Sequence, residues 1–140
     1  MKVLVVEDCH FTQRIVHLHL QKHGFETHLC CQGEEALSVL EVDPAYDLIV
    51  SDIVMPVMGG LELLAEVKRR PQLSTIPFIL LTGKQDSETV QKAVQMGCCA
   101  YILKPVNPGI MMAQIKQVLG QESEWEVRPG GSYASKATFL

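Results

Sequence analysis

Residues 47–60 read D-L-I-V-S-D-I-V-M-P-V-M-G-G, and this stretch decides the fold. Within residues 47–51 the three central residues, 48–50, are apolar, which is typical of a short strand buried on both faces of a sheet. Asp52 follows, and a proline and a Gly-Gly pair mark the next residues as a loop. From Leu61 the apolar spacing becomes helical and continues to around Pro71. The stretch therefore predicts one strand–loop–helix unit.

The same unit repeats on both sides of this stretch. On the first predicted helix Phe11, Ile15 and Leu18 recur at i, i+4 and i+7, along one face of a helix that ends near Gly24. The predicted strands are residues 2–6, 25–30, 47–51, 77–81 and 100–103, and the later helices follow Gly33, Leu61, Ser87 and Asn107. Strands alternating with helices in this way predict an α/β fold: a five-stranded parallel, doubly wound sheet with helices on both faces. Right-handed crossovers favour the flavodoxin-like strand order 2-1-3-4-5.

Polar residues stand where the predicted strands end. Glu7 and Asp8 follow the first strand, Asp52 the third, Thr82 the fourth and Lys104 the fifth. The carboxyl ends of parallel strands share one edge of the sheet, so these side chains are expected to converge there. Carboxylates brought so close repel one another unless a cation lies among them, and Mg²⁺ is the expected ion because it prefers oxygen ligands.

The same residues suit a transferred phosphoryl group. Lys104 and a cation neutralise phosphoryl oxygens, while the Thr82 hydroxyl and backbone N–H groups near Val54 and Gly83 donate hydrogen bonds. Asp52 is the expected nucleophile, since a carboxylate can itself accept the group as an aspartyl phosphate. Each residue alone has a plainer interpretation: Asp8 as a helix cap, and a single Asp, Thr or Lys as part of a solvated loop. Only their occurrence together, each at the end of its own strand, favours a site.

The bulk properties narrow the class of protein. The chain has 140 residues, 47% hydrophobic and 20% charged, as in an ordinary globular domain. The net charge is −4, and Lys68-Arg69-Arg70 is the cationic cluster, so direct nucleic-acid binding is not expected. Apolar runs are too short for a membrane span. Five cysteines, an odd number, and the absence of a signal-peptide pattern predict a cytoplasmic protein without a disulfide framework.

These motifs resemble the receiver domain of two-component response regulators over roughly residues 1–120. The family pattern has an acidic pair, an acceptor Asp followed by x-x-M-P-x-M-x-G, a Thr or Ser before a small residue, an aromatic residue, and a Lys-Pro pair. The matching positions are Glu7, Asp8, Asp52, Met55, Pro56, Met58, Gly60, Thr82, Gly83, Tyr101, Lys104 and Pro105.

The resemblance implies a signalling switch and not an enzyme, apart from self-catalysed gain and slow loss of the phosphoryl group. A histidine kinase or phosphotransfer protein would supply that group, and Asp8, Asp52, the Val54 carbonyl and Glu7 would bind Mg²⁺. Thr82 would then move inward and Tyr101 would follow, changing the face of helix 4, strand 5 and helix 5. That face would control an unidentified partner or output domain, or support a weak homodimer.

Other functions fit the residues less well. An aspartyl-phosphate hydrolase would need a second Asp two residues after the nucleophile, where this chain has Val54. A nucleotide or flavin binder would need a phosphate-binding loop after the first strand, where Glu7 and Asp8 repel anions. A receiver-shaped scaffold that is never phosphorylated stays open. Residues 121–140 show neither helical nor strand periodicity and are expected to form a C-terminal tail or the start of a linker.

Overall fold

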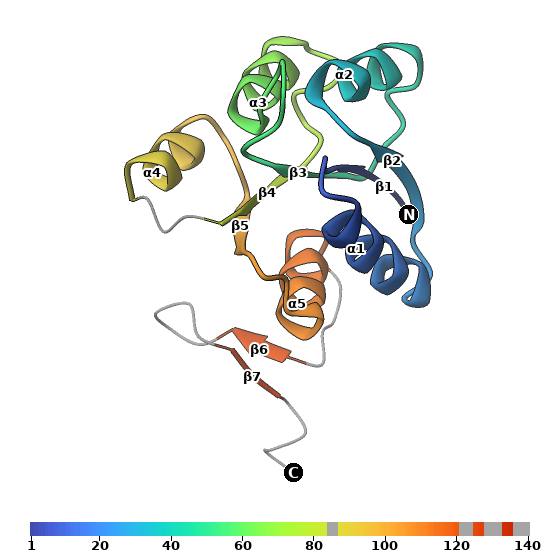
Figure 1. Ribbon diagram of the computed structural model, residues 1–140, viewed down its shortest axis with the longest axis vertical. Helices are drawn as coiled ribbons and strands as arrows, with labels where there is room; N and C mark the ends of the chain where they lie inside the picture. Colours follow the sequence, from blue (N-terminus) through green and yellow to red (C-terminus); the bar gives the residue numbers. More distant parts are fainter. Residues whose placement is uncertain (84–86, 121–124, 128–132, 136–140) are drawn as a thin grey trace.

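The computed structural model describes residues 1–83, 87–120, 125–127 and 133–135. Strands and helices alternate along the chain through the first 118 residues (Figure 1). The elements are β1 (Lys2–Val6), α1 (His10–Lys22), β2 (Glu26–Cys30), α2 (Gly33–Val42), β3 (Leu48–Asp52), α3 (Gly60–Arg69), β4 (Phe78–Thr82), α4 (Ser87–Gln95), β5 (Ala100–Leu103), α5 (Pro108–Val118), β6 (Trp125–Val127) and β7 (Tyr133–Ser135).

The main sheet has five strands in the order β2-β1-β3-β4-β5, and every neighbouring pair is parallel. This confirms the predicted fold class and strand order. All residues of β3 and β4 are buried, as expected for strands covered on both faces. Both strands end one residue later than predicted, so Asp52 and Thr82 are the last residues of β3 and β4 and are held by the sheet itself.

Two apolar cores fill the space on either side of the sheet. One contains α1 and α5 residues, including Val16, Leu20 and Ile115, packed against one face of β1 and β3. The other joins α2, α3 and α4 to the opposite face. Figure 1 shows α1 and α5 on one side of the strands and α2 and α3 on the other. The prediction of helices on both faces is confirmed.

The apolar face predicted for α1 is not the buried face. Phe11 is 76% exposed, and Leu18 is also exposed. The buried residues of this helix are Gln13, Val16 and Leu20, spaced i, i+3 and i+7. The prediction failed because the buried face includes a polar residue, Gln13, which an apolar periodicity cannot reveal.

A short hairpin follows α5, although residues 121–140 show no strand periodicity. β6 and β7 pair antiparallel, with Trp125 opposite Ser135 and Val127 opposite Tyr133. β6 contacts α5. The hairpin forms a two-stranded sheet of its own, and the remaining residues of 121–140, predicted to be a tail or the start of a linker, lie outside the described residues. Within the described residues, no helix is both long enough and apolar enough to cross a bilayer.

Candidate functional site

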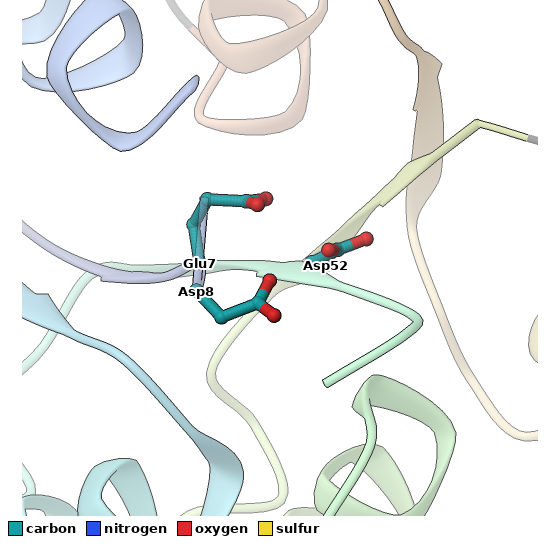
Figure 2. A group of neighbouring side chains, drawn as sticks. All are labelled: Glu7, Asp8 and Asp52. Atoms are coloured by element: carbon teal, nitrogen blue, oxygen red, sulfur yellow. The ribbon is translucent and has the colours of Figure 1, made fainter. Parts of the chain in front are cut away.

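Three carboxylates meet at the carboxyl ends of β1 and β3. These strands are neighbours in the sheet, with Val6 opposite Ser51. Figure 2 shows Glu7 and Asp8 just beyond β1, with Asp52 beside them at the end of β3. One oxygen from each of Glu7, Asp8 and Asp52 lies within 4.8 Å of the other two. The structure therefore brings together the predicted acidic residues.

Lys104 reaches these carboxylates from the end of β5, which is separated from β3 by β4 in the sheet. Its backbone N–H donates to the Thr82 carbonyl at 2.8 Å, which fixes the turn after β5. Its Nζ donates to Glu7 Oε1 at 3.0 Å and lies 3.0 Å from Asp52 Oδ2. A single ammonium group thus touches two carboxylates that the sequence separates by 45 residues or more from one another and from the lysine.

Glu7 is the most deeply buried member of the cluster, with an exposed fraction of 0% against 6% for Asp52. Its Oε1 accepts hydrogen bonds from Lys104 and, at 3.1 Å, from the Cys9 backbone N–H. Its Oε2 also lies 3.0 Å from Lys104 Nζ, but the angles do not make a hydrogen bond, so this buried atom lacks one among the described residues. Burying a carboxylate oxygen without a hydrogen bond is costly, so a further positive group beside this oxygen would lower that cost.

The pKa values of Glu7 and Lys104 reflect this crowding. Burial raises the pKa of Glu7, the hydrogen bond from Lys104 opposes that rise, and the charge of Asp52 adds to it. Burial would lower the pKa of Lys104, but its hydrogen bonds to Glu7 and Asp52 outweigh burial, so its pKa is raised. Lys104 is therefore cationic at neutral pH.

The donor set suits a hard cation. It consists of carboxylate oxygens on converging strand ends, one of them buried without a hydrogen bond. Mg²⁺ binds through one or a few carboxylates and keeps several waters, and the exposed side chain of Asp8 leaves a solvent-facing side for them. Glu7, Asp8 and Asp52 together therefore fit a magnesium ion.

Backbone N–H groups of the loop after β3 and of the start of α3 hold Asp52 and the next residue in place. The Val54 N–H donates to Asp52 Oδ1 at 3.4 Å, and the Gly60 N–H donates to the Ile53 carbonyl at 2.9 Å. A Cβ on Gly60 would lie 2.1 Å from the Asp52 carbonyl oxygen, far inside contact distance. The second glycine of the Gly-Gly pair is thus required by the close approach of α3 to the backbone of Asp52.

Thr82 and Tyr101, the two residues predicted to form a switch, lie on neighbouring strands. Thr82 ends β4 and is buried, while Tyr101 is 41% exposed on β5. Tyr101 stands opposite Leu80, two residues before Thr82, so both side chains project from the same face of the sheet. Val54 lies at the mouth of the site with an exposed side chain.

Gln13 is the buried polar residue of this region that the sequence did not predict. Its side-chain amide donates to the Glu7 carbonyl and to the Cys30 carbonyl, each at 3.1 Å. It contacts the backbone of the acidic pair directly, although it belongs to α1. Its spacing from the buried apolar residues is the sequence signal that could have identified it. Gln13 lies three residues before Val16, so both side chains share the buried face of the helix.

Comparison with known proteins agrees with this geometry. The family model described as "Response regulator receiver domain" matches residues 3–116. "Probable transcriptional regulator ycf29" of Pyropia yezoensis is 35% identical over 121 residues, covering 86% of this chain and 54% of that protein. The chain thus spans about half the length of that relative.

Smaller relatives match over nearly their whole length. "Chemotaxis protein CheY1" of Helicobacter pylori is 32% identical over 121 residues, covering 86% of this chain and 98% of that protein. The solved structure of the chemotaxis response regulator CheY4 of Vibrio cholerae has a TM-score of 0.78 and 32% identity, covering 84% of this chain and 97% of that one. On its sequence, its fold and the position of its acidic cluster, this chain belongs to the response regulator receiver domains.

Proposed function

We propose that this receiver domain is a phosphorylation-operated switch in which Asp52 accepts a phosphoryl group with the help of Mg²⁺. The observation that carries the proposal is the position of Lys104 Nζ, 3.0 Å from Asp52 Oδ2, beside a cluster of three carboxylates. A carboxylate between an ammonium group and a cation site can approach the phosphorus of a dianionic group without prohibitive repulsion.

In the proposed reaction an oxygen of Asp52 forms a bond to phosphorus while the bond from phosphorus to the donor breaks. The donor keeps the electron pair of the broken bond, and the product is an acyl phosphate on Asp52. Lys104 pairs with the phosphoryl oxygens, and the Thr82 hydroxyl and the N–H groups of Val54 and Gly83 donate to them.

Glu7, Asp8, Asp52 and the Val54 carbonyl are the proposed ligands of the ion. Bound Mg²⁺ would neutralise charge on the phosphoryl oxygens as it builds up during transfer. Glu7 would act directly or through a water molecule.

The phosphoryl donor in this proposal is a histidine kinase or a histidine phosphotransfer protein. Receiver domains are signalling switches, and the proposed reactions of this chain are self-catalysed gain and slow loss of the phosphoryl group. The proposal includes a cytoplasmic location, which the free thiols of Cys9, Cys30, Cys31, Cys98 and Cys99 support because such thiols persist in a reducing compartment.

The proposed output is the face of α4, β5 and α5. Val94, Tyr101 and Leu103 are exposed apolar side chains on α4 and β5. Thr82 lies on the same sheet face as Tyr101, so an inward movement of Thr82 would open space for the ring. Moving a two-state element from mostly off to mostly on takes about 5.5 kcal/mol. A few charge-assisted hydrogen bonds to the phosphoryl group, at about 1.5–3 kcal/mol each, are sufficient.

Intact mass spectrometry after incubation with acetyl phosphate tests the acceptor chemistry. We expect a gain of one phosphoryl group that requires Mg²⁺ and is absent in Asp52→Asn. Asp47→Asn is a matched control, because Asp47 accepts from the Lys2 N–H at the opposite end of β3. A gain in Asp52→Asn equal to that of the native chain would contradict the assignment of Asp52.

A further inference from the structure

Gln13 joins α1 to the ends of two strands beside the acidic cluster. The side chain is buried, with an exposed fraction of 9%. Its Nε2 lies 3.1 Å from the Glu7 carbonyl oxygen and 3.1 Å from the Cys30 carbonyl oxygen. A primary amide nitrogen carries two hydrogens, so each carbonyl can receive one of them. The Gln13 amide is therefore fully used as a donor toward the backbone.

These carbonyls lie where the sheet ladder stops. The pairing of β1 with β2 ends at Val6 and Cys30, and its pairing with β3 ends at Val6 and Ser51. The Glu7 N–H still reaches the Cys30 carbonyl at 3.0 Å, but the Glu7 carbonyl lies beyond the last pair of both ladders. Gln13 supplies the hydrogen bond that the sheet does not, at a place where an unpaired carbonyl would be costly.

The hydrogen bond from Gln13 to the Glu7 carbonyl affects the acidic cluster through the peptide bond between Glu7 and Asp8. The Glu7 carbonyl and the Asp8 N–H lie in one rigid plane, so holding the carbonyl also fixes the direction in which the chain continues to Asp8. The Glu7 carboxylate is held separately, by the Cys9 N–H and Lys104. Asp8 has no such support: its carboxylate makes no hydrogen bond or ion pair with any residue in the described part of the chain. Its position depends on the backbone that Gln13 anchors.

We propose that Gln13 is a positioning residue of the cation site, which holds the Glu7–Asp8 peptide so that both carboxylates converge with Asp52. Gln13 neither binds the ion nor touches the phosphoryl group. The inference rests on the proposed function, in which Glu7, Asp8 and Asp52 hold Mg²⁺.

This role requires a side chain at position 13 that donates hydrogen bonds. A side chain that only filled space in the core would not need donors. Gln13→Met has nearly the same length and volume but removes the donor to the Glu7 carbonyl, whereas the Cys30 carbonyl keeps the hydrogen bond from the Glu7 N–H. The peptide plane is then free to turn, and the acidic side chains lose their common orientation. Residues that orient metal ligands typically contribute 10- to 100-fold to affinity, so we expect the Mg²⁺ dissociation constant of Gln13→Met to rise about tenfold.

The test is a Mg²⁺ titration of the isotope-labelled 140-residue chain, followed through the backbone amide signals of Asp8 and Val54. Val16→Ala is the control, because Val16 is fully buried on the same helix and belongs to the apolar core. We expect Val16→Ala to lower the urea midpoint and keep the native dissociation constant. We expect Gln13→Met to raise the constant and, without the ion, to shift the Asp8 and Cys9 amide signals.

A second measurement on the native chain guards against a variant that does not fold. The side-chain amide protons of Gln13 should exchange slowly with solvent and should shift when Mg²⁺ is added. Fast exchange without a shift would overturn the inference, as would equal dissociation constants for the native chain and Gln13→Met. Failure of the native chain itself to bind Mg²⁺ would instead overturn the proposed function.

Discussion

Removing the charge of Lys104 is the perturbation whose effect the structure defines best. This ammonium group lies 3.0 Å from carboxylate oxygens of both Glu7 and Asp52. Lys104→Met keeps most of the apolar stem and removes the charge. The fully buried Glu7 then faces Asp52 with no cation between them.

The cost follows from the burial of the partners. Removing one partner of a buried ion pair typically costs about 3–5 kcal/mol. Two features place the expected cost at the lower end of this range. The Lys104 side chain is 21% exposed, and Glu7 can take up a proton because burial already raises its pKa. We expect Lys104→Met to lose about 3 kcal/mol of unfolding free energy in the absence of Mg²⁺. Mg²⁺ at about 100 times its dissociation constant should restore about 2.7 kcal/mol.

Urea unfolding at neutral pH, with EDTA or with Mg²⁺, measures both quantities. Lys92→Met is the control, because Lys92 is exposed on α4 and forms no ion pair within the described residues. Its unfolding free energy should stay within about 0.5 kcal/mol of the native value. A loss below about 1 kcal/mol for Lys104→Met in EDTA would refute the reasoning, because the buried carboxylates would then not need the ammonium group.

Three further predictions concern the loop after β3 and the thiols. Gly60→Ala should cost about 3 kcal/mol in urea unfolding, because its Cβ would meet the Asp52 carbonyl, whereas Gly83→Ala, with open space around it, should cost nothing. Val57→Gly should raise the unfolding free energy by about 1 kcal/mol, because Val57 has a φ of 68°, which a β-branched residue adopts only with strain. Alkylation in mildly alkaline buffer, followed by peptide mass spectrometry, should label Cys9 well before Cys30: hydrogen bonds from Thr12 lower the pKa of Cys9, and burial raises that of Cys30 to about 12. Equal costs for the two alanine variants, an unchanged midpoint for Val57→Gly, or equal labelling of the two thiols would each contradict the corresponding statement.

The strands could be located because their signals are local in the sequence, and their order then followed from the rule of right-handed crossovers. Most strands of the main sheet are short apolar runs, although β2 (E-T-H-L-C) is more polar, and the parallel arrangement follows from the alternation of strands with helices. The ends of β3 and β4 were predicted one residue too early, because Asp52 and Thr82 are polar residues that the sheet nevertheless includes. The buried face of α1 was predicted wrongly, because exposed Phe11 and Leu18 carry more apolar character than the Gln13 that replaces them inside.

The cation site could be predicted in outline for a topological reason. The carboxyl ends of adjacent parallel strands lie side by side, and this does not depend on the residues that connect the strands. Glu7, Asp8 and Asp52 were therefore expected to lie together. The contact of Lys104 with both Glu7 and Asp52 depends on the turn after β5, which no pattern specifies. The support from Gln13 depends on how α1 is rotated, and amphipathic periodicity fixed that rotation incorrectly.

The most direct test of the central claim is to identify the residue that carries the phosphoryl group. Borohydride reduces an acyl phosphate on aspartate to homoserine, which peptide sequencing by mass spectrometry then locates. After incubation with acetyl phosphate and Mg²⁺, we predict homoserine at position 52 and aspartate unchanged at position 8. Homoserine at position 8, or none at position 52 in a chain whose mass has increased by one phosphoryl group, would contradict the account.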